Sequence, residues 1–275
     1  MSLFNAFRFD GKRALVVGGA TGMGAAAAEV LQSAGADVTV MDFAAVTLTG
    51  AHGIHVNLSE RASIDAAMAS VTGTVDVLLS CAGVADGTPG IERINFLGHR
   101  YMIDQFLARG QLVRGSAIGM ISSAAGLGWE ANLTQLIELL DIADWDASVE
   151  WVQRNNKADY MSMKQAMCAY VARQAHDFIK LGIRINAICP GPTDTPLAQA
   201  NKDQWLGFAS DYRADVGTEA STSLEQAYPL VFLCSAAAAA INGQTIVSDQ
   251  GYLASGVTGS FPAATMVAQF LLGKL

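Results

Sequence analysis

The chain has 275 residues, of which 51% are hydrophobic and 15% are charged, and its net charge is −8. A composition this apolar argues against a disordered chain, and the length is sufficient to bury a sizeable core. There is no run of Lys or Arg, and no apolar run near the ~20 residues that span a bilayer, which argues against a nucleic-acid partner and a membrane protein.

The N-terminus lacks the charged and apolar regions of an export signal, so we expect a cytoplasmic protein. Cysteines at four apolar positions, without C-x-x-C spacing, indicate buried reduced thiols rather than disulfides. They are Cys81, Cys168, Cys189 and Cys234. The histidines do not have the spacing of metal ligands, so we expect no metal site and interpret them as ordinary surface or loop residues. They are His52, His55, His99 and His176.

The first structural signal is a strand, a glycine turn and a helix. Residues 14–17 form a short apolar run, and an Ala-rich helical stretch ends near Gly35. Between them lies Gly18-Gly19-Ala20-Thr21-Gly22-Met23-Gly24. Glycines let the backbone approach a pyrophosphate, and the helix N-terminus offers free N–H groups to it. The pattern therefore favours dinucleotide binding over a simple tight turn.

A second strand over residues 37–41 ends at Asp42, which lies 18 positions after Gly24. The dinucleotide fold has an acidic residue about 20 positions after its glycines, where it accepts hydrogen bonds from ribose hydroxyls. Since an anion there repels a 2′-phosphate, the position favours NAD over NADP.

Further apolar strands alternate with helical segments. A third strand closes at residues 55–57, a helix follows over residues 59–70, and a fourth strand at 75–80 leads into Cys81-Ala82-Gly83. The next helix begins near Gly90, and a fifth strand at 118–121 carries Ser123 just beyond its carboxyl end. This alternation predicts an α/β protein of one domain, with a single doubly wound Rossmann-type parallel sheet and helices on both faces.

Residues 129–157 predict two short helices, the second capped by Asp146. The following helix starts at Tyr160 and ends at Gly182, and it places Tyr160 and Lys164 on one face. An ammonium beside a phenol favours the phenolate, which predicts a pKa for Tyr160 below the usual value of about 10. Such a Tyr can exchange a proton near neutral pH, although an isolated Tyr-x-x-x-Lys pair is commonly just a core residue beside a solvated Lys.

A sixth strand at residues 183–188 leads to a Pro- and Gly-rich loop. The segment 197–216 is predicted to place Trp205, Phe208 and Tyr212 on one helical face, as a substrate lid or as a surface that packs on a partner subunit. A last helix over residues 224–240 should be kinked or split by Pro229, and residues 244–248 form the last strand.

With these motifs in order on one sheet, residues 10–255 closely resemble the short-chain dehydrogenase/reductase family. Its T-G-x-x-x-G-x-G motif appears as residues 17–24 with Val17 in place of Thr, and its N-N-A-G motif appears as Ser80-Cys81-Ala82-Gly83. Its active-site Asn, Ser, Tyr and Lys fall on Asn95, Ser123, Tyr160 and Lys164. The resemblance implies cofactor contacts from Gly18, Ala20, Thr21, Gly22, Met23, Gly24, Asp42, Phe43, Asn57, Leu58, Cys81, Ala82, Gly83, Tyr160, Lys164, Pro190, Gly191, Thr193 and Thr195.

Several positions depart from the family pattern. Asn57 stands where an Asp near the adenine is usual, and its amide oxygen could accept the same hydrogen bond. The 37 residues between Ser123 and Tyr160 exceed the family norm, and this insertion is similar to the bacterial 3α-hydroxysteroid dehydrogenase/carbonyl reductase branch. The insertion in that branch alters the subunit interface, so we expect a homo-oligomer, either a dimer or a tetramer. The apolar tail 260–275 has no counterpart in the resemblance.

The function implied is NAD-dependent interconversion of a secondary alcohol and a ketone. Tyr160 would be the acid or base, Lys164 would lower its pKa and bind the nicotinamide ribose, and Ser123 would hold the substrate oxygen. Asn95 would position a water that links Lys164 to solvent. The aromatic side chains of 197–216, together with Trp129, suggest an apolar cyclic substrate such as a steroid or aryl ketone. The alternatives are a reductase that works mainly on a carbonyl substrate and a low-turnover protein that senses NAD or serves as a scaffold.

Overall fold

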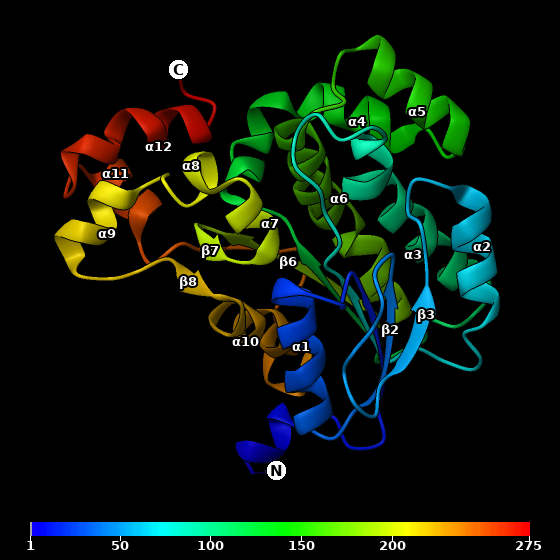
Figure 1. Cartoon of the computed structure of the whole chain (residues 1–275). Coiled ribbons are helices and arrows are strands. Elements are labelled where there is room, and N and C mark those ends of the chain that lie inside the picture. Colours follow the sequence, from blue (N-terminus) through cyan, green and yellow to red (C-terminus); the bar gives the residue numbers. More distant parts are fainter. Residues whose placement is uncertain (1) are drawn as a thin grey trace.

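The computed structural model describes residues 2–275, and a seven-stranded parallel sheet forms its centre (Figure 1). The strands are β1 (Arg13–Val17), β2 (Asp37–Asp42), β3 (His52–His55), β4 (Val77–Ser80), β5 (Ala117–Ile121), β6 (Arg184–Pro190) and β9 (Thr245–Ser248). Their order is β3-β2-β1-β4-β5-β6-β9. Every neighbouring pair is parallel, so the predicted doubly wound sheet is confirmed.

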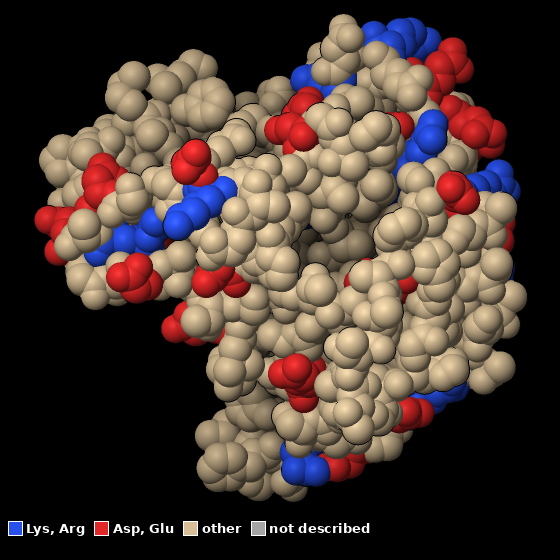
Figure 2. Space-filling model, in the orientation of Figure 1, with Lys and Arg blue, Asp and Glu red and all other residues tan. Residues whose placement is uncertain are grey.

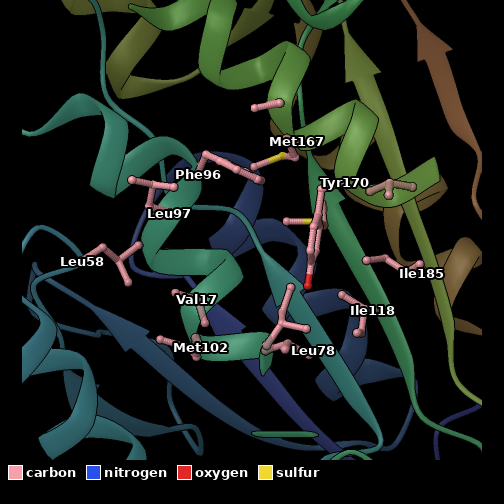
Figure 3. Close-up of a cluster of buried hydrophobic side chains, with 14 of the residues drawn as sticks. Val17, Leu58, Leu78, Phe96, Leu97, Met102, Ile118, Met167, Tyr170 and Ile185 are labelled. Carbon is pink, nitrogen blue, oxygen red and sulfur yellow. The ribbon is translucent and has the colours of Figure 1, made fainter. Parts of the chain in front are cut away.

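Helices cover both faces of the sheet, because consecutive strand residues point to opposite sides and both sides are apolar. On one face, α1 (Gly22–Ser33) and α10 (Ser223–Cys234) pack on Val16 and Leu79. The other face carries α2 (Arg61–Ala69), α3 (Gly98–Ala108) and α6 (Tyr160–Leu181), which pack on Leu15 and Leu78. Figure 3 shows part of this second cluster, where Met167 and Tyr170 of α6 lie among side chains of the sheet and of the segment before α3.

The insertion forms the two predicted helices, α4 (Leu133–Asp141) and α5 (Trp145–Arg154), after a 3₁₀ turn, η4 (Trp129–Asn132). The predicted cap at Asp146 is wrong. The carboxylate of Asp144 accepts a hydrogen bond from the backbone N–H of Ala147 at 2.9 Å, so Asp146 lies in the first turn. Arg100 on α3 donates to the carbonyl groups of Leu139 and Ile142, which ties the end of α4 to the main body.

Residues 197–216 do not form one helix, contrary to the sequence prediction. They form α7 (Pro196–Ala200), α8 (Lys202–Trp205) and α9 (Ser210–Val216). The break has a clear backbone cause, because Ala209 adopts a left-handed conformation with φ of 55° between α8 and α9. Trp205 is therefore separated from Phe208 and Tyr212, and the three side chains do not share a helical face.

Pro229 does not split α10, which runs from Ser223 to Cys234 and is followed by the 3₁₀ turn η5 (Ala236–Ala238). A capping box between Thr222 and Glu225 fixes its N-terminus. The chain ends in α11 (Tyr252–Thr258), the short turn η6 (Pro262–Ala264) and α12 (Thr265–Leu271). Within residues 2–275, no helix is long and apolar enough to cross a membrane.

Smaller elements complete the described chain. They are η1 (Phe4–Phe7), the π-helical turn η2 (Arg93–Leu97), η3 (Ala124–Gly126) and the two-stranded sheet of β7 (Thr193–Asp194) and β8 (Ser221–Thr222). All four cysteines are free thiols, as predicted, but Cys81 is only partly buried, whereas the other three are buried. The Sγ atoms of Cys168 on α6 and Cys189 on β6 lie 3.7 Å apart.

Candidate active site

The candidate site lies where β1 and β4 are neighbours, because the sheet continues from these strands in opposite directions. The loops at their carboxyl ends line a cavity of about 450 Å³, and Figure 2 shows a hollow surrounded mainly by uncharged atoms on this face. The predicted cofactor residues that line it are Gly18, Thr21, Gly22, Met23, Gly24, Asp42, Phe43, Asn57, Leu58, Cys81, Ala82, Gly83 and Thr195. The structure thus gathers residues from five separate segments of the chain.

The glycine turn has the close backbone contacts that a phosphate cradle requires. Gly18 has a φ of 84°, and a Cβ atom there would lie 2.2 Å from the backbone nitrogen of Ala82. A Cβ atom at Gly24 would lie 2.0 Å from the carbonyl oxygen of Gly18. The turn leads directly into the N-terminus of α1, whose first N–H groups have no partner within the helix. These residues fit the pyrophosphate of a dinucleotide.

Asp42 is held at the edge of the cavity by two backbone groups. Its Oδ2 accepts a hydrogen bond from the N–H of Ala20 at 2.9 Å, and its Oδ1 accepts one from the N–H of Ala44 at 2.8 Å. Ala20 does not itself line the cavity, so its role is to hold the carboxylate of Asp42 in place through this hydrogen bond. Since carboxylate oxygens accept several hydrogen bonds each, Asp42 retains acceptor capacity toward the cavity.

Asn57 lines the cavity, but its side chain is engaged by its own loop. Its Oδ1 accepts hydrogen bonds from the N–H and hydroxyl of Ser59, at 3.0 and 2.8 Å, and its Nδ2 donates to Glu60 at 2.8 Å. Both acceptor positions of the amide oxygen are thus used. The predicted hydrogen bond from adenine to this oxygen would have to displace Ser59.

Three predicted residues of the nicotinamide loop do not line this cavity. Pro190 ends β6, Gly191 donates its N–H to the carbonyl of Ser248 at 3.0 Å, and the hydroxyl of Thr193 donates to the carbonyl of Gly191 at 3.0 Å. These contacts fix the conformation of the loop. Within it, the side chain of Thr195 lies near Gly22 of the glycine turn. Sequence reasoning missed the apolar lining of Val17, Val56, Val84, Ile94, Pro196 and Leu197. Each of the six lies within two residues of a predicted site residue, which was the available signal.

The four predicted catalytic residues come from three elements. Asn95 lies in the π-helical turn, Ser123 follows β5, and Tyr160 and Lys164 begin α6. The buried ammonium of Lys164 donates to the carbonyl of Ile121 at 2.7 Å and lies 5.5 Å from the centre of the Tyr160 ring.

Asn95 is joined to this group through the loop of Gly83. Its amide accepts from the N–H of Val84 and donates to the carbonyl of Val84, at 2.8 and 2.9 Å. A Cβ atom at Gly83 would lie 3.5 Å from Asn95 Oδ1 and 3.7 Å from Lys164 Nζ. Asn95, Tyr160 and Lys164 are thus gathered beside Gly83, which lines the cavity, whereas none of the four predicted catalytic residues lines it directly.

Burial is the largest influence on the pKa values of Tyr160 and Lys164. It raises the pKa of Tyr160 above the usual value, and a side-chain hydrogen bond with Ser123 opposes that shift. It also lowers the pKa of Lys164 to about 8. The predicted lowering of the Tyr160 pKa by Lys164 is therefore wrong, because both groups are removed from water and the loss of hydration disfavours each charged form.

Three further contacts fix the position of Tyr160 and the start of its helix. The carboxylate of Asp86 accepts a hydrogen bond from the backbone N–H of Tyr160 at 2.6 Å, and Asp159 caps α6 by accepting from the N–H of Ser162 at 2.8 Å. The indole of Trp205 packs on the phenol ring, with 5.1 Å between ring centres and an interplanar angle of 50°. Trp205 is the aromatic side chain of the predicted lid that contacts Tyr160.

His99 is a buried residue of the site rather than a surface or loop residue, contrary to the sequence interpretation. It lies one helical turn after Asn95, is 1% exposed, and its Nε2 is 3.0 Å from the carbonyl oxygen of Ala82. Burial lowers the pKa of His99 to about 4, so the ring is neutral at pH 7. A neutral ring donates from Nε2 to Ala82, where the loops after β1 and β4 meet.

Comparison with known proteins identifies the family. A model described as short chain dehydrogenase matches residues 12–132, and one described as enoyl-(acyl carrier protein) reductase matches residues 142–253. The 3-alpha-hydroxysteroid dehydrogenase/carbonyl reductase of Comamonas testosteroni is 30% identical over 86% of this chain and 95% of its own length. The chain belongs to the short-chain dehydrogenase/reductase family.

Two other similar proteins extend this comparison. The coniferyl-alcohol dehydrogenase of Pseudomonas sp. strain HR199 is 29% identical over 87% of this chain and 96% of its own length. A 3-alpha-hydroxysteroid dehydrogenase from Pseudomonas sp. B-0831, solved with NADH, has a TM-score of 0.72, with 24% identity over 91% of this chain and 99% of that one. The structural likeness supports the fold, and the family assignment makes the chain an alcohol- or ketone-directed oxidoreductase that uses a nicotinamide cofactor.

Proposed function

We propose that the protein interconverts a secondary alcohol and a ketone on an apolar, cyclic substrate, with NAD as the cofactor. The observation that carries this proposal is the environment of Tyr160, where burial raises the pKa of the phenol, the neighbouring Ser123 side chain opposes that rise, and the ring lies beside Lys164 and packs on Trp205. A proton donor, an oxygen-holding hydroxyl and an apolar wall then meet at one point, which is what carbonyl reduction and alcohol oxidation require.

Each side chain has a defined task in this proposal. Tyr160 takes the hydroxyl proton of the alcohol during oxidation and returns it to the ketone oxygen during reduction. Ser123 holds the same oxygen and stabilises the phenolate through its hydrogen bond. Lys164 keeps a positive charge behind Tyr160, and Asn95 has one N–H and one lone pair left to hold a water on the route from Lys164 to solvent. When bound, NAD supplies the hydride acceptor.

The preference for NAD follows from Asp42 and its surroundings. Its carboxylate faces a cavity whose lining contains no Lys or Arg within the described chain. A ribose 2′-phosphate would meet this anion without a compensating cation, and close like charges at an interface cost several kcal/mol. Ribose hydroxyls, by contrast, can donate hydrogen bonds to the carboxylate.

The substrate class rests on Trp205 and on the relatives. The indole of Trp205, tilted against the phenol of Tyr160, offers a flat apolar surface to a ring, and aromatic pairs add about 0.5–1.5 kcal/mol beyond the burial of their area. Two relatives are named for coniferyl alcohol and for 3-alpha-hydroxysteroids. We therefore propose a ring-bearing alcohol, and Phe208 and Tyr212 do not contribute to its contact surface, because they pack on Tyr252 instead.

The test replaces Tyr160 by Phe, which keeps the ring contact with Trp205 and removes the proton. Turnover of a cyclic alcohol should fall by at least about 10²-fold, as expected for the loss of a positioned acid or base. NAD binding, measured by calorimetry, should stay within a few-fold of wild type. Tyr228→Phe is the matched control, since Tyr228 is exposed on α10. Near wild-type turnover by Tyr160→Phe would contradict the mechanism, and NAD binding without turnover in wild type would favour a sensor or scaffold.

A further inference from the structure

The chain continues beyond the part that the family models match, which ends at residue 253. The remaining residues form a helical hairpin of α11, η6 and α12. The two helices touch at Gly256, where a Cβ atom would lie 2.7 Å from the carbonyl oxygen of Ala264 and 2.8 Å from the Cβ of Ala268. Within the hairpin, the N–H of Phe261 also donates to the carbonyl of Ser255 at 3.2 Å. The hairpin is therefore a packed unit rather than a loose tail.

One end of the hairpin lies directly on the segment that follows the catalytic serine. We call residues 123–132, which contain η3 and η4, the Ser123 wall. A Cβ atom at Gly128 would lie 2.5 Å from the carbonyl oxygen of Leu271 and 2.8 Å from the backbone nitrogen of Gly273. These contacts join backbone to backbone, so the end of α12 cannot move toward Gly128 by side-chain rearrangement. The end of α12 is therefore packed closely against the backbone of the Ser123 wall at Gly128.

The other end of the hairpin anchors the segment that carries Trp205. We call residues 202–216, which contain α8 and α9, the Trp205 wall. The ring of Tyr212 lies 5.2 Å from the ring of Phe261 and 5.5 Å from that of Tyr252, and the ring of Phe208 lies 5.2 Å from that of Tyr252. In Figure 1, the red α11 and α12 accordingly lie beside the yellow α8 and α9.

Hydrogen bonds connect the segment that follows Trp205 to α9, which carries Tyr212. The guanidinium of Arg213 on α9 donates to the carbonyls of Phe208 and Leu206, which lie in the turn between α8 and α9. That turn includes the left-handed Ala209, which is itself buried in the aromatic cluster. The position of Trp205 over Tyr160 is thus set through α9 by the hairpin.

We propose that the hairpin of α11 and α12 is a brace that fixes the separation of the Ser123 wall and the Trp205 wall, and so sets the size of ring that the site accepts. This inference rests on the proposed function, because it concerns the substrate of the same site. The hairpin is a positioning element, since none of its residues is placed against the reacting groups. It connects to both walls by backbone and aromatic packing, with Lys274 as the sole charged residue after Asp249.

The first test measures hydrogen exchange in the protein without ligands. One variant lacks residues 271–275, which removes the contact at Gly128, and the other is Phe261→Ala, which removes the contact with Tyr212. The reporters are the N–H of Ala131, bonded to Gly128, and the N–H of Arg213, bonded to Ala209. A brace requires each variant to raise exchange at both reporters, by about 5-fold or more, because local opening sets the exchange rate.

Met266→Ala is the matched control, because Met266 lies on α12 with 66% of its surface exposed and should change neither reporter. If each variant raises exchange only in the wall that it touches, or in neither wall, the hairpin is not a brace. If the shortened chain does not fold, Phe261→Ala alone decides the question through the distant reporter in the Ser123 wall.

The second test compares kcat/KM for 2-propanol, cyclohexanol and 1-indanol at saturating NAD. Both variants should lower kcat/KM for 1-indanol by about 10-fold, since small misplacements of a bound substrate are costly, and leave 2-propanol within about 2-fold. Equal losses on all three alcohols, or none, would overturn the brace. If the wild-type protein oxidises none of them, the proposed function fails, and the exchange experiment still decides the brace on its own.

Discussion

Replacing Lys164 by Met should change how the stability of the protein depends on pH. Burial lowers the pKa of Lys164 to about 8 from an ordinary value of 10.5. One pKa unit corresponds to about 1.4 kcal/mol, so this difference is worth about 3 kcal/mol. Between these two pH values the unfolded chain binds the proton and the folded chain releases it, so the stability of the wild type rises with pH. Met has a similar length and cannot titrate.

The assay is urea unfolding of wild type and Lys164→Met at pH 7.5, 8.5, 9.5 and 10.5, followed by circular dichroism. The quantity of interest is the difference in the free energy of unfolding between the two proteins, which cancels all other titrating groups. Wild type should gain about 3 kcal/mol relative to the variant between pH 8 and 10.5, whatever the offset caused by the lost hydrogen bond to Ile121. Lys180→Met, on the exposed end of α6, is the control. A difference that stays constant over this range would refute the reasoning.

Three other predictions concern separate parts of the molecule. Asp42→Ala should weaken NAD binding by about 10–100-fold, since hydrogen bonds to a charged group contribute about 1.5–3 kcal/mol, and should narrow the preference for NAD over NADP in calorimetry. Arg184→Met should lower the free energy of unfolding by about 1.5–3 kcal/mol in urea, because five carbonyls between residues 233 and 241 lose a shared cationic donor. In His99→Asn, the free energy of unfolding should fall less steeply than in wild type as the pH falls from 6.5 to 4. The pKa of His99 is about 4 in the folded protein, so the wild type loses stability as the unfolded chain takes up the proton over this range.

The elements that carry the proposed catalytic residues could be predicted from the sequence because their signals are local. The helix that carries Tyr160 begins at the predicted residue and ends at Leu181, with Gly182 in the left-handed conformation expected of a helix terminator. The strand before Ser123 was equally clear, since both sides of a parallel sheet are apolar. By contrast, the predicted cap of the second insertion helix was displaced by two residues, because Asp144 and Asp146 have the same side chain and only the structure shows that Asp144 caps the helix.

The error over the lid arose because periodicity describes side chains and not the backbone between them. Trp205, Phe208 and Tyr212 are spaced like one face of a helix. The turn between α8 and α9 nevertheless depends on a left-handed Ala209, a conformation that Ala rarely adopts and that its identity does not signal. The aromatic partners that stabilise this turn, Tyr252 and Phe261, lie about 40 or more residues away along the chain, so only the folded structure shows them.

His99 and the C-terminal hairpin were missed for a related reason. A lone His in a helical segment carries no spacing signal, and its role follows from the carbonyl of Ala82, which another strand delivers. The hairpin meets the Ser123 wall at Gly128 through backbone atoms, and a backbone contact leaves no side-chain pattern to detect. Contacts of this kind join segments that are distant in the sequence and leave no motif. They can therefore be recognised only in the three-dimensional structure.

The burial of Tyr160 and Lys164 gives the Tyr-x-x-x-Lys spacing a different meaning from the one that sequence suggests. In water, an ammonium beside a phenol would favour the phenolate. In this fold, loss of hydration raises the pKa of Tyr160 and lowers that of Lys164, so both groups move toward their neutral forms. Ser123 is then the neighbour that opposes this rise in the pKa of Tyr160 and so favours the phenolate. Ser123→Ala should therefore move the pH dependence of alcohol oxidation to higher pH as well as lower the rate, and a loss of rate with no change in pH dependence would show that Ser123 only positions the substrate.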